Sequence, residues 1–241
     1  MSKLSVDIFI PVHNNGEEIE KSITEQVEFY TKHLQSYDWK IIIADNASTD
    51  NTKIIASALS KKYKNVEHTF THLKGRGNAL ALNWRKSNAD IVTYMDVDLA
   101  TKLDAFPKLI NAIAHGSDIA IGSRYVAGSQ SQRSVKRFFL SKALNLLLKI
   151  TLGVRFSDAQ CGFKGAKSEV AKEIIPHIKN TNWFWDAEFL YVAEKAGYGI
   201  IEVPICWSEG SKSGVKAFKT VFEFLKGIMR MKLTKIVVHN D

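Results

Sequence analysis

The chain has 241 residues, of which 45% are hydrophobic and 24% are charged, and this balance excludes a largely disordered protein. Its formal charge of +8 favours an anionic partner but does not choose among nucleic acid, a nucleotide sugar and acidic lipid. The two cysteines, Cys161 and Cys206, lack C-x-x-C or Cys/His spacing, so we expect reduced thiols in a cytoplasmic protein. We expect neither a signal peptide nor a membrane span, because no apolar run approaches roughly 18 residues.

Apolar runs alternate with helical patterns through the first half of the chain. A helix is predicted from Ile19 to Leu34, a second begins near Asn51, and a third passes through Leu80 and Trp84. Strands are predicted at residues 6–12, 40–44, 66–71, 91–95 and 118–122. This alternation predicts right-handed crossovers and a mainly parallel sheet. Dinucleotide-binding and P-loop enzymes are excluded, because the glycine pair at 75 and 77 lacks a third glycine and no Walker A sequence occurs.

The second half of the chain is less regular. The pattern predicts an amphipathic helix at 135–152, a polar segment at 157–165, a helix at 186–196, a strand at 199–205 and a basic helix at 215–233. No linker-like stretch separates the two halves, so we expect a single domain.

Two carboxylates stand directly behind the apolar run 91–95, at Asp96 and Asp98. The carboxyl end of a buried strand is where open α/β sheets bind their ligands. Two acids one residue apart at such an edge can hold a divalent ion that also contacts a substrate's phosphates. The alternative for Asp98 is that it caps a helix.

Several segments carry a joint resemblance across roughly residues 5 to 215. In order, they are residues 10–14, 43–50, 74–80, 96–99, 122–125, Arg137 with Ser141, 157–164 and 202–205. Together they resemble family 2 glycosyltransferases of GT-A fold, in particular the polyprenyl-phosphate (dolichyl-phosphate) mannose and glucose synthases. The resemblance implies an α/β, Rossmann-like, mainly parallel central sheet flanked by helices. It also implies a catalytic domain at residues 1–210, followed by a basic amphipathic helix at 211–241.

The resemblance implies a donor site for a nucleotide-diphosphate sugar, either UDP-glucose or GDP-mannose. The residues that it assigns to the donor are Pro11, His13, Asp45, Asn46, Lys74, Asp96, Asp98 and Lys212. The family often has Glu where Asn15 stands and a second Asp where Asn46 stands. A helix-capping turn is the alternative interpretation of residues 45–50. The segment 207–212 resembles the corresponding segment of the glucosyl-type members more than that of the mannosyl-type members, and this likeness favours UDP-glucose as the donor.

The metal motif that the resemblance assigns is Asp96 with Asp98, holding Mg²⁺ or Mn²⁺ against the departing phosphate. The predicted catalytic residues are these two with Asp158 and Asp186, the latter pair as positioning groups or as a base for a hydroxyl acceptor. Structural hydrogen bonding is the alternative for Asp158 and Asp186.

The resemblance assigns the acceptor phosphate to Arg124, Arg137 and Ser141. Arginine offers a planar fork that matches phosphate, and a hydroxyl adds one donor. A solvated basic helix face is the alternative. A phosphate monoester is largely a dianion near pH 7, so it attacks without an obligatory general base.

Basic amphipathic stretches at 135–152 and 212–235 are typical of helices that lie on an anionic membrane surface. We therefore expect peripheral contact with the cytoplasmic face of a membrane. The alternative is ordinary core-facing helices with solvated lysines.

The leading hypothesis is an inverting, metal-dependent hexosyltransferase that acts on a polyprenyl phosphate. A second hypothesis is a transferase that uses the same donor but transfers the sugar to a hydroxyl group of a glycan or a protein. A third is a non-enzymatic basic binding module. Nucleic acid is not expected as a partner, because groove-binding and RNA-binding signatures are absent.

Overall fold

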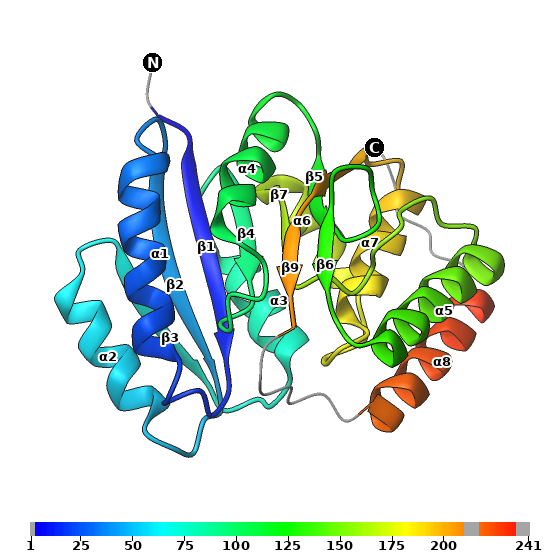
Figure 1. Ribbon diagram of the computed structural model, residues 1–241, viewed down its shortest axis with the longest axis horizontal. Helices are drawn as coiled ribbons and strands as arrows, with labels where there is room; N and C mark the ends of the chain where they lie inside the picture. Colours follow the sequence, from blue (N-terminus) through cyan, green and yellow to red (C-terminus); the bar gives the residue numbers. More distant parts are fainter. Residues whose placement is uncertain (1–2, 210–216, 235–241) are drawn as a thin grey trace.

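A computed structural model describes residues 3–209 and 217–234. Its centre is a seven-stranded sheet in the order β3-β2-β1-β4-β7-β5-β8 (Figure 1). All neighbouring strands are parallel except β7, which runs antiparallel to β4 and β5. The strands are β1 (Ser5–Val12), β2 (Asp38–Asn46), β3 (Val66–Thr71), β4 (Ile91–Met95), β5 (Ile119–Ser123), β7 (Phe163–Lys167) and β8 (Ile200–Pro204). The predicted α/β class with a mainly parallel sheet is confirmed.

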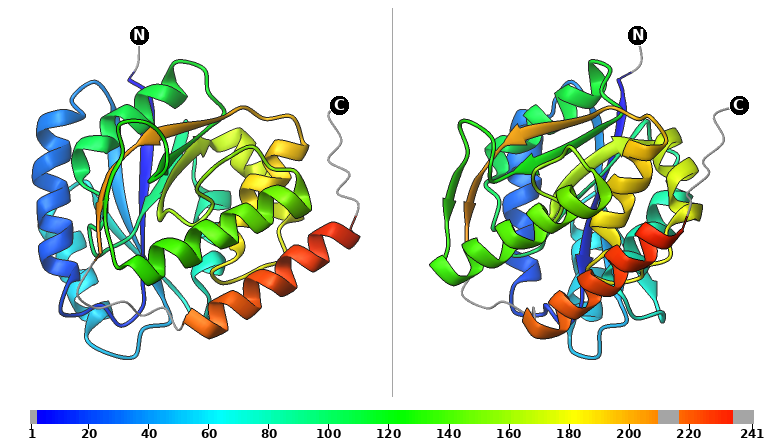
Figure 2. Two further views of the ribbon diagram at one scale, coloured as in Figure 1. Left: turned by 45° about the vertical axis from the view of Figure 1, so that its right-hand side comes forward. Right: turned by 90° about the vertical axis from the view of Figure 1, so that its right-hand side faces the viewer.

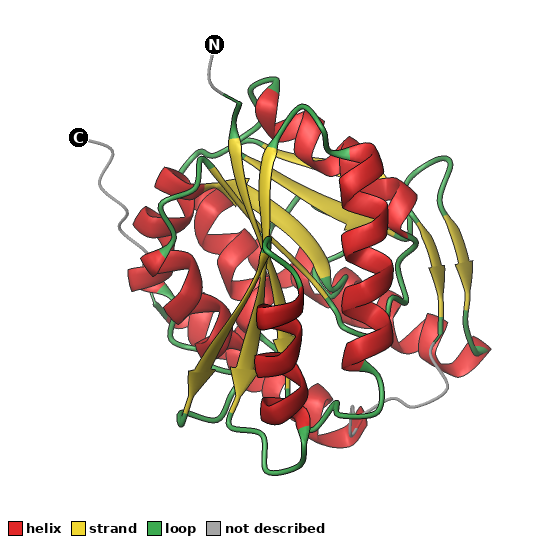
Figure 3. Cartoon of the chain, turned by 90° about the vertical axis from the view of Figure 1, so that its left-hand side faces the viewer, coloured by secondary structure: helices red, strands yellow, loops and turns green. Residues whose placement is uncertain are grey.

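Helices cover both faces of the sheet, as the side view in Figure 3 shows. One face packs against α1 (Ile19–His33), α2 (Thr52–Lys62) and α4 (Phe106–Ala114). The other packs against α3 (Arg76–Lys86), α5 (Val135–Leu152), α6 (Ser168–Ile174), α7 (Trp185–Lys195) and α8 (Ala217–Leu233). Successive strand residues alternate between the two cores: Ile8 and Ile10 belong to one and Phe9 to the other.

Two short 3₁₀ helices and a small ribbon complete the described elements. The 3₁₀ helices cover Leu103–Ala105 and Ile175–His177. Strands β6 (Gln130–Gln132) and β9 (Cys206–Ser208) pair in parallel as a separate two-stranded ribbon beside the main sheet.

Strand β7 lies where the sequence suggested a polar segment, at 157–165. Its middle residues, Lys164 and Gly165, read as loop residues, yet Lys164 has no exposed surface. The lysine is buried because its Nζ lies 3.3 Å from a carboxylate oxygen of Asp186. A buried ion pair of this kind leaves no hydrophobic pattern in the sequence, so the strand was missed.

Helices α5 and α8 pack side by side at one end of the molecule, as two views show (Figure 2). The bounds of α5 are those predicted. Helix α8 is held against the core through Phe224, whose ring centroid lies 5.1 Å from that of Phe184. In the part of the chain that the structure describes, no helix is long and apolar enough to cross a membrane. The boundary at 210/211 stays a prediction, since residues 210–216 lie outside the described ranges.

The carboxyl ends of β1, β2 and β4 meet at one edge of the sheet. Each leads into a loop with a non-glycine residue at positive φ: Asn14 at 57°, Ala47 at 54° and Leu99 at 52°. Left-handed backbone is unfavourable for residues with a side chain, and such strain gathers at functional edges. The predicted turn at 45–50 begins only at Ala47, because Asp45 and Asn46 still belong to β2.

Candidate active site

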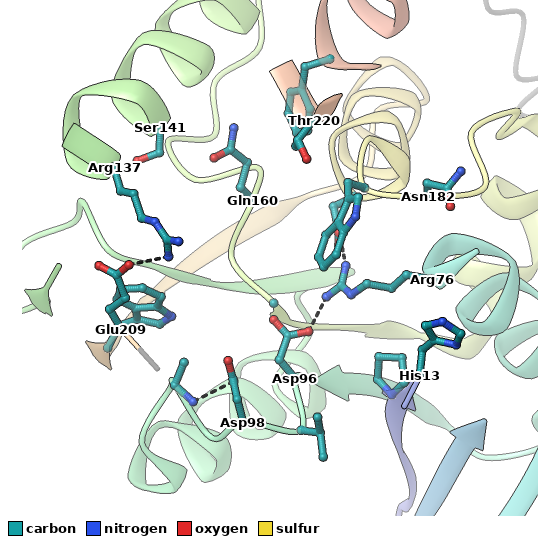
Figure 4. A pocket seen from close by; sticks show the side chains of 18 of the residues that line it. His13, Arg76, Asp96, Asp98, Arg137, Ser141, Gln160, Asn182, Glu209 and Thr220 are labelled. Carbon is teal, nitrogen blue, oxygen red and sulfur yellow. Dashed lines mark hydrogen bonds and ion pairs between the residues drawn. The ribbon is translucent and has the colours of Figure 1, made fainter. Parts of the chain in front are cut away.

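A cavity of about 580 Å³ opens at this edge of the sheet and extends to α5 and α8. Its size suits a small-molecule substrate. It brings together most of the predicted site residues: Pro11, His13, Asn46, Lys74, Asp96, Asp98, Arg124, Arg137, Ser141 and Asp186. Figure 4 shows Asp96, Asp98 and His13 at one end, with Arg137 and Ser141 at the other. Asp45 and Asp158 do not line the cavity, and Lys212 lies outside the described residues.

The first end of the cavity is organised by β2 and the loop before α3. The side-chain oxygen of Asn46 accepts a hydrogen bond of 2.9 Å from the backbone N–H of Gly75. A Cβ at Gly75 would lie 2.4 Å from the carbonyl oxygen of Thr181, and its φ is +139°, so only glycine fits there. His13 Nδ1 lies 2.8 Å from the carbonyl oxygen of Asn46. These contacts fix the backbone next to Lys74.

Asp45 lies behind the cavity wall and serves the turn that follows it. Its Oδ1 accepts a 3.0 Å hydrogen bond from the N–H of Ser48, which closes a local turn. This bond does not cap α2, because that helix begins only at Thr52. Its Oδ2 is buried without a hydrogen-bond partner and lies 3.7 Å from His68 Nε2. Burial lowers the pKa of His68, although the nearby Asp45 charge opposes that shift.

The two acids after β4 differ in their surroundings. Asp96 Oδ1 accepts a 2.6 Å hydrogen bond from Arg76, while Asp98 Oδ1 accepts one of 3.1 Å from the N–H of Ala100. Burial, and then the charge of Asp96, raise the pKa of Asp98. Among the described residues, no group of three or more His, Cys, Asp or Glu side chains is placed to hold a metal ion. Two carboxylates suit Mg²⁺ or a similar ion that takes its remaining oxygens from water and phosphate.

Gly162 provides the space that the Asp96 carboxylate occupies. The backbone N–H of Asp96 donates to the carbonyl oxygen of Gly162 at 3.0 Å. A Cβ at Gly162 would lie 1.7 Å from Asp96 Oδ2. Two atoms cannot approach this closely, so any side chain at position 162 would clash with the Asp96 carboxylate in its present position. The absence of a side chain at position 162 therefore sets where this carboxylate can lie.

Arg76 lines the cavity but was not among the predicted site residues. One terminal nitrogen lies 2.6 Å from Asp96 and the other 2.6 Å from Asp186. The guanidinium also lies 4.9 Å from the ring centre of Tyr94 and 5.2 Å from that of Trp183. The segment 74–80 was noted as a failed dinucleotide motif and as part of the family resemblance, but neither observation paired Arg76 with two distant acids.

The Asp186 carboxylate is engaged in ion pairs with Arg76 and Lys164. It accepts hydrogen bonds from the Tyr94 hydroxyl and from Arg76, and Lys164 Nζ lies 3.3 Å away. Burial would raise its pKa, but the Lys164 and Arg76 charges outweigh burial and hold it below its usual value. A carboxylate with a lowered pKa is a weak proton acceptor.

Asp158 is paired in the same way behind the other end of the cavity. It is fully buried and accepts hydrogen bonds from Arg124 Nε and Nη2, both 2.7 Å, and from the Arg124 backbone N–H at 3.0 Å. Burial would raise the pKa of Asp158, but the Arg124 guanidinium holds it below its ordinary value. The arrangement fits the structural role considered as the alternative for Asp158.

The second end of the cavity carries three arginines and a hydroxyl. Arg137 forms an ion pair with Glu209, and Arg124 stays with Asp158. Ser141 Oγ lies 2.7 Å from both the Tyr125 hydroxyl and Arg133 Nη1. Arg133 was not among the predicted site residues.

The fold and this cavity define an α/β protein with a small-molecule site at the carboxyl edge of its sheet, and comparison with known proteins gives the family. Residues 7–175 match the family described as glycosyl transferase family 2. The chain belongs to glycosyl transferase family 2. The predicted family is confirmed.

Proteins with related sequences have known names. The chain is 30% identical to dolichol-phosphate mannosyltransferase of Pyrococcus furiosus. The match covers 95% of this chain and 64% of that protein. The chain is 28% identical to glycosyltransferase AglD of Haloferax volcanii over 94% of this chain and 37% of that one. It is also 28% identical to dolichyl-phosphate beta-glucosyltransferase of Saccharomyces cerevisiae, over 87% of this chain and 69% of the yeast protein. The first two relatives therefore extend well beyond the matched region.

Solved structures share the fold. Glucosyl-3-phosphoglycerate synthase of Mycobacterium tuberculosis, in complex with Mn²⁺, UDP-glucose and phosphoglyceric acid, superposes with a TM-score of 0.72 at 15% identity. That match covers 95% of this chain and 79% of the other. The mannosyltransferase PcManGT of Pyrobaculum calidifontis, in complex with GDP-Man and Mn²⁺, gives a TM-score of 0.64 at 17% identity, covering 99% and 66%. The predicted GT-A fold is confirmed.

The buried pair of Asp158 and Arg124 gives a prediction for stability. Asp158→Asn leaves the guanidinium without its counter-charge, so the free energy of unfolding near pH 7 should fall by about 3–5 kcal/mol. Urea denaturation measures this change. Because the folded pKa of Asp158 is lowered, the ion pair stabilises the protein above about pH 4. That stabilisation disappears as the pH falls through the folded pKa, so the difference between variant and wild type should shrink there.

Asp38→Asn is the matched control, because Asp38 is exposed at the amino end of β2. Its unfolding free energy should stay within about 0.5 kcal/mol of wild type. Equal stability of Asp158→Asn and wild type at pH 7 would show that the pair contributes nothing.

Proposed function

We propose that this protein transfers a hexose from UDP-glucose or GDP-mannose to a polyprenyl phosphate at a membrane surface. The observation that carries the proposal is that one cavity joins a pair of strand-end carboxylates to a cationic end lined by Arg124, Arg133 and Arg137. The relatives named as dolichyl-phosphate transferases support the lipid acceptor. The structural neighbours solved with UDP-glucose or GDP-Man support the donor class.

In this proposal the donor occupies the end of the cavity near β1, β2 and β4. Pro11, His13 and Lys74 surround the nucleotide, and Asp96 with Asp98 hold Mg²⁺ or Mn²⁺. When bound there, the ion would supply a Lewis acid for the charge that develops on the leaving phosphate. Arg76 keeps the Asp96 carboxylate oriented from the opposite side.

The transfer is a single displacement with inversion. An oxygen of the acceptor phosphate forms a bond to the anomeric carbon, and the bond from that carbon to the donor's β-phosphate oxygen breaks. The departing nucleoside diphosphate takes the electron pair. No proton has to be removed, because a phosphate monoester is already largely a dianion near neutral pH.

The state of the two remaining acids favours a phosphate acceptor over a hydroxyl. A hydroxyl would need a general base, and Asp158 and Asp186 were the residues predicted for that task. Both are held in ion pairs with lowered pKa values, and Asp158 does not line the cavity. A nucleophile that arrives ionised needs neither of them.

The outer faces of α5 and α8 support action at a membrane. Large apolar side chains recur there at every third, fourth or seventh position and are exposed by 43% to 83%: Val135, Phe139, Leu146 and Ile150 on α5, and Phe222, Leu225, Met229 and Leu233 on α8. Exposed lysines flank both stripes: Lys136, Lys142, Lys149, Lys226 and Lys232. Apolar stripes edged by lysines suit the surface of an anionic bilayer. We place this contact at the cytoplasmic face.

The inner faces of the same helices line the cavity. Ser141 and Leu144 contribute from α5, and Val221 and Phe224 from α8. Helices α5 and α8 thus connect the proposed membrane contact on their outer faces with the acceptor end of the cavity on their inner faces.

The decisive experiment is a transfer assay. Radiolabelled UDP-glucose and GDP-mannose are each incubated with polyprenyl phosphate and Mg²⁺ or Mn²⁺, and the organic-phase product is counted. One donor should give product, and Asp98→Ala should lower kcat at least about a hundredfold, because metal stabilisation of the leaving group contributes several kcal/mol. Asp38→Ala, exposed at the far end of β2, is the control. Full activity of Asp98→Ala refutes the metal role, and transfer to water-soluble glycans instead of lipid favours the hydroxyl hypothesis.

Gly162 gives an independent test of the metal site. In Gly162→Ala the Asp96 carboxylate must move, so Mn²⁺ affinity measured by electron paramagnetic resonance should fall by roughly tenfold or more. Gly199→Ala is the matched control, since its nearest contact would be an ordinary 3.5 Å from Asp118. Wild-type Mn²⁺ affinity in Gly162→Ala would exclude Asp96 as a ligand.

The membrane contact is tested with vesicles. The double variant Phe139→Ser/Ile150→Ser removes two side chains exposed by 64% and 74%. Each would contribute about 1.5–3 kcal/mol if buried in lipid, so binding to anionic vesicles in a sedimentation assay should weaken by at least about a hundredfold. Ile54→Ser, exposed by 74% on α2, should bind like wild type. Equal vesicle binding by wild type and both variants would exclude the outer face of α5 as the membrane contact.

A further inference from the structure

The three arginines at the acceptor end of the cavity differ in their partners. Arg124 is bound by Asp158 through two hydrogen bonds, and Arg137 is paired with Glu209. Arg133 lines the same cavity but has no carboxylate partner within ion-pair distance among residues 3–209 and 217–234. It therefore presents a positive charge that these parts of the chain leave uncompensated.

Two donor groups here are buried and unsatisfied. Among the residues that the structure describes, Arg133 Nε and Nη2 have no hydrogen-bond partner, and neither does Gln160 Nε2. Both side chains line the cavity. Most buried donors in proteins are satisfied, and leaving one unpaired is costly, more so when it is charged. An anion between them would accept from both.

The guanidinium is held in place without a carboxylate. Arg133 Nη1 donates to Ser141 Oγ at 2.7 Å. Its central carbon lies 5.1 Å from the ring centre of Tyr125 and 4.9 Å from that of Phe138. Two aromatic contacts and one hydrogen bond fix the plane of the fork, so its free N–H groups are oriented before a ligand arrives.

Gln160 lines the same cavity from another segment of the chain. It belongs to the segment between α5 and β7, next to Asp158 and Gly162. Figure 4 shows Gln160 facing the cavity on the same side as Ser141 and Arg137. An amide N–H₂ and a serine hydroxyl add neutral donors to the guanidinium, a combination that suits phosphate oxygens.

We propose that Arg133, with Ser141 and Gln160, binds the phosphate monoester of the acceptor, and that Arg124 instead supports the fold through Asp158. This inference rests on the proposed function, because it names the group that receives the acceptor's phosphate. The ligand chemistry is a phosphate monoester dianion, which a lipid headgroup or free inorganic phosphate could supply.

Equilibrium binding tests the proposal. Wild type, Arg133→Gln and Gln160→Leu are titrated calorimetrically with farnesyl phosphate and, separately, with inorganic phosphate. Arg133→Gln should weaken binding about tenfold to a hundredfold, and Gln160→Leu by a smaller factor, because a charged hydrogen bond contributes more than a neutral one. Binding of UDP-glucose in the presence of Mn²⁺ should change less than about twofold in each variant. A lipid source predicts tighter binding of farnesyl phosphate than of inorganic phosphate, whereas a free-phosphate source predicts similar affinities.

Arg85→Gln is the matched control, since Arg85 is exposed on α3 and does not line the cavity. Arg133→Lys keeps the charge and should recover part of the affinity, and it replaces Arg133→Gln if thermal unfolding shows that variant to be misfolded. Wild-type phosphate affinity in Arg133→Gln, or no phosphate binding by wild type, overturns the proposal. Arg133-dependent phosphate binding without sugar transfer to any polyprenyl phosphate refutes the proposed function and leaves the anion site standing.

Discussion

A buried guanidinium at the end of the sheet organises the donor side of this protein. Arg76, at the start of α3, bridges Asp96 after β4 and Asp186 in α7. Three separate segments are thereby tied at one point, and Lys164 of β7 joins the same group of charges. Removing the Asp186 carboxylate would leave the fully buried Lys164 without this ion pair, which is costly. The position of the Asp96 carboxylate is therefore a property of the whole sheet edge rather than of its own loop.

The two ends of the cavity use charge in opposite ways. Carboxylates face the cavity next to the strands, and arginines face it next to α5. Most of these charges are already paired: Asp186 with Arg76 and Lys164, and Arg137 with Glu209. Substrate recognition then depends on the few groups that are not. Asp98 is one such group, because within residues 3–209 and 217–234 its carboxylate accepts only a backbone hydrogen bond. Arg133 is another, on the opposite side.

Much of the architecture could be read from the sequence, because apolar alternation and helical spacing reflect burial directly. The parallel strands and α5 were found this way. Contacts between distant polar residues leave no such pattern. Strand β7 was hidden because its buried Lys164 resembles a surface residue, and Arg76 was hidden because its partners lie 20 and 110 positions away. The same reason explains Asp158, whose motif marked it as important but not as the buried partner of Arg124.

The pairing of α5 with α8 has a consequence for how an acceptor would be found. Both helices present one side to the cavity and the other to the outside. In the proposed orientation the hydrocarbon tail of the acceptor stays in the bilayer throughout the reaction. Its search is then confined to two dimensions, and its local concentration is set by the lipid composition of the leaflet rather than by its solubility in water.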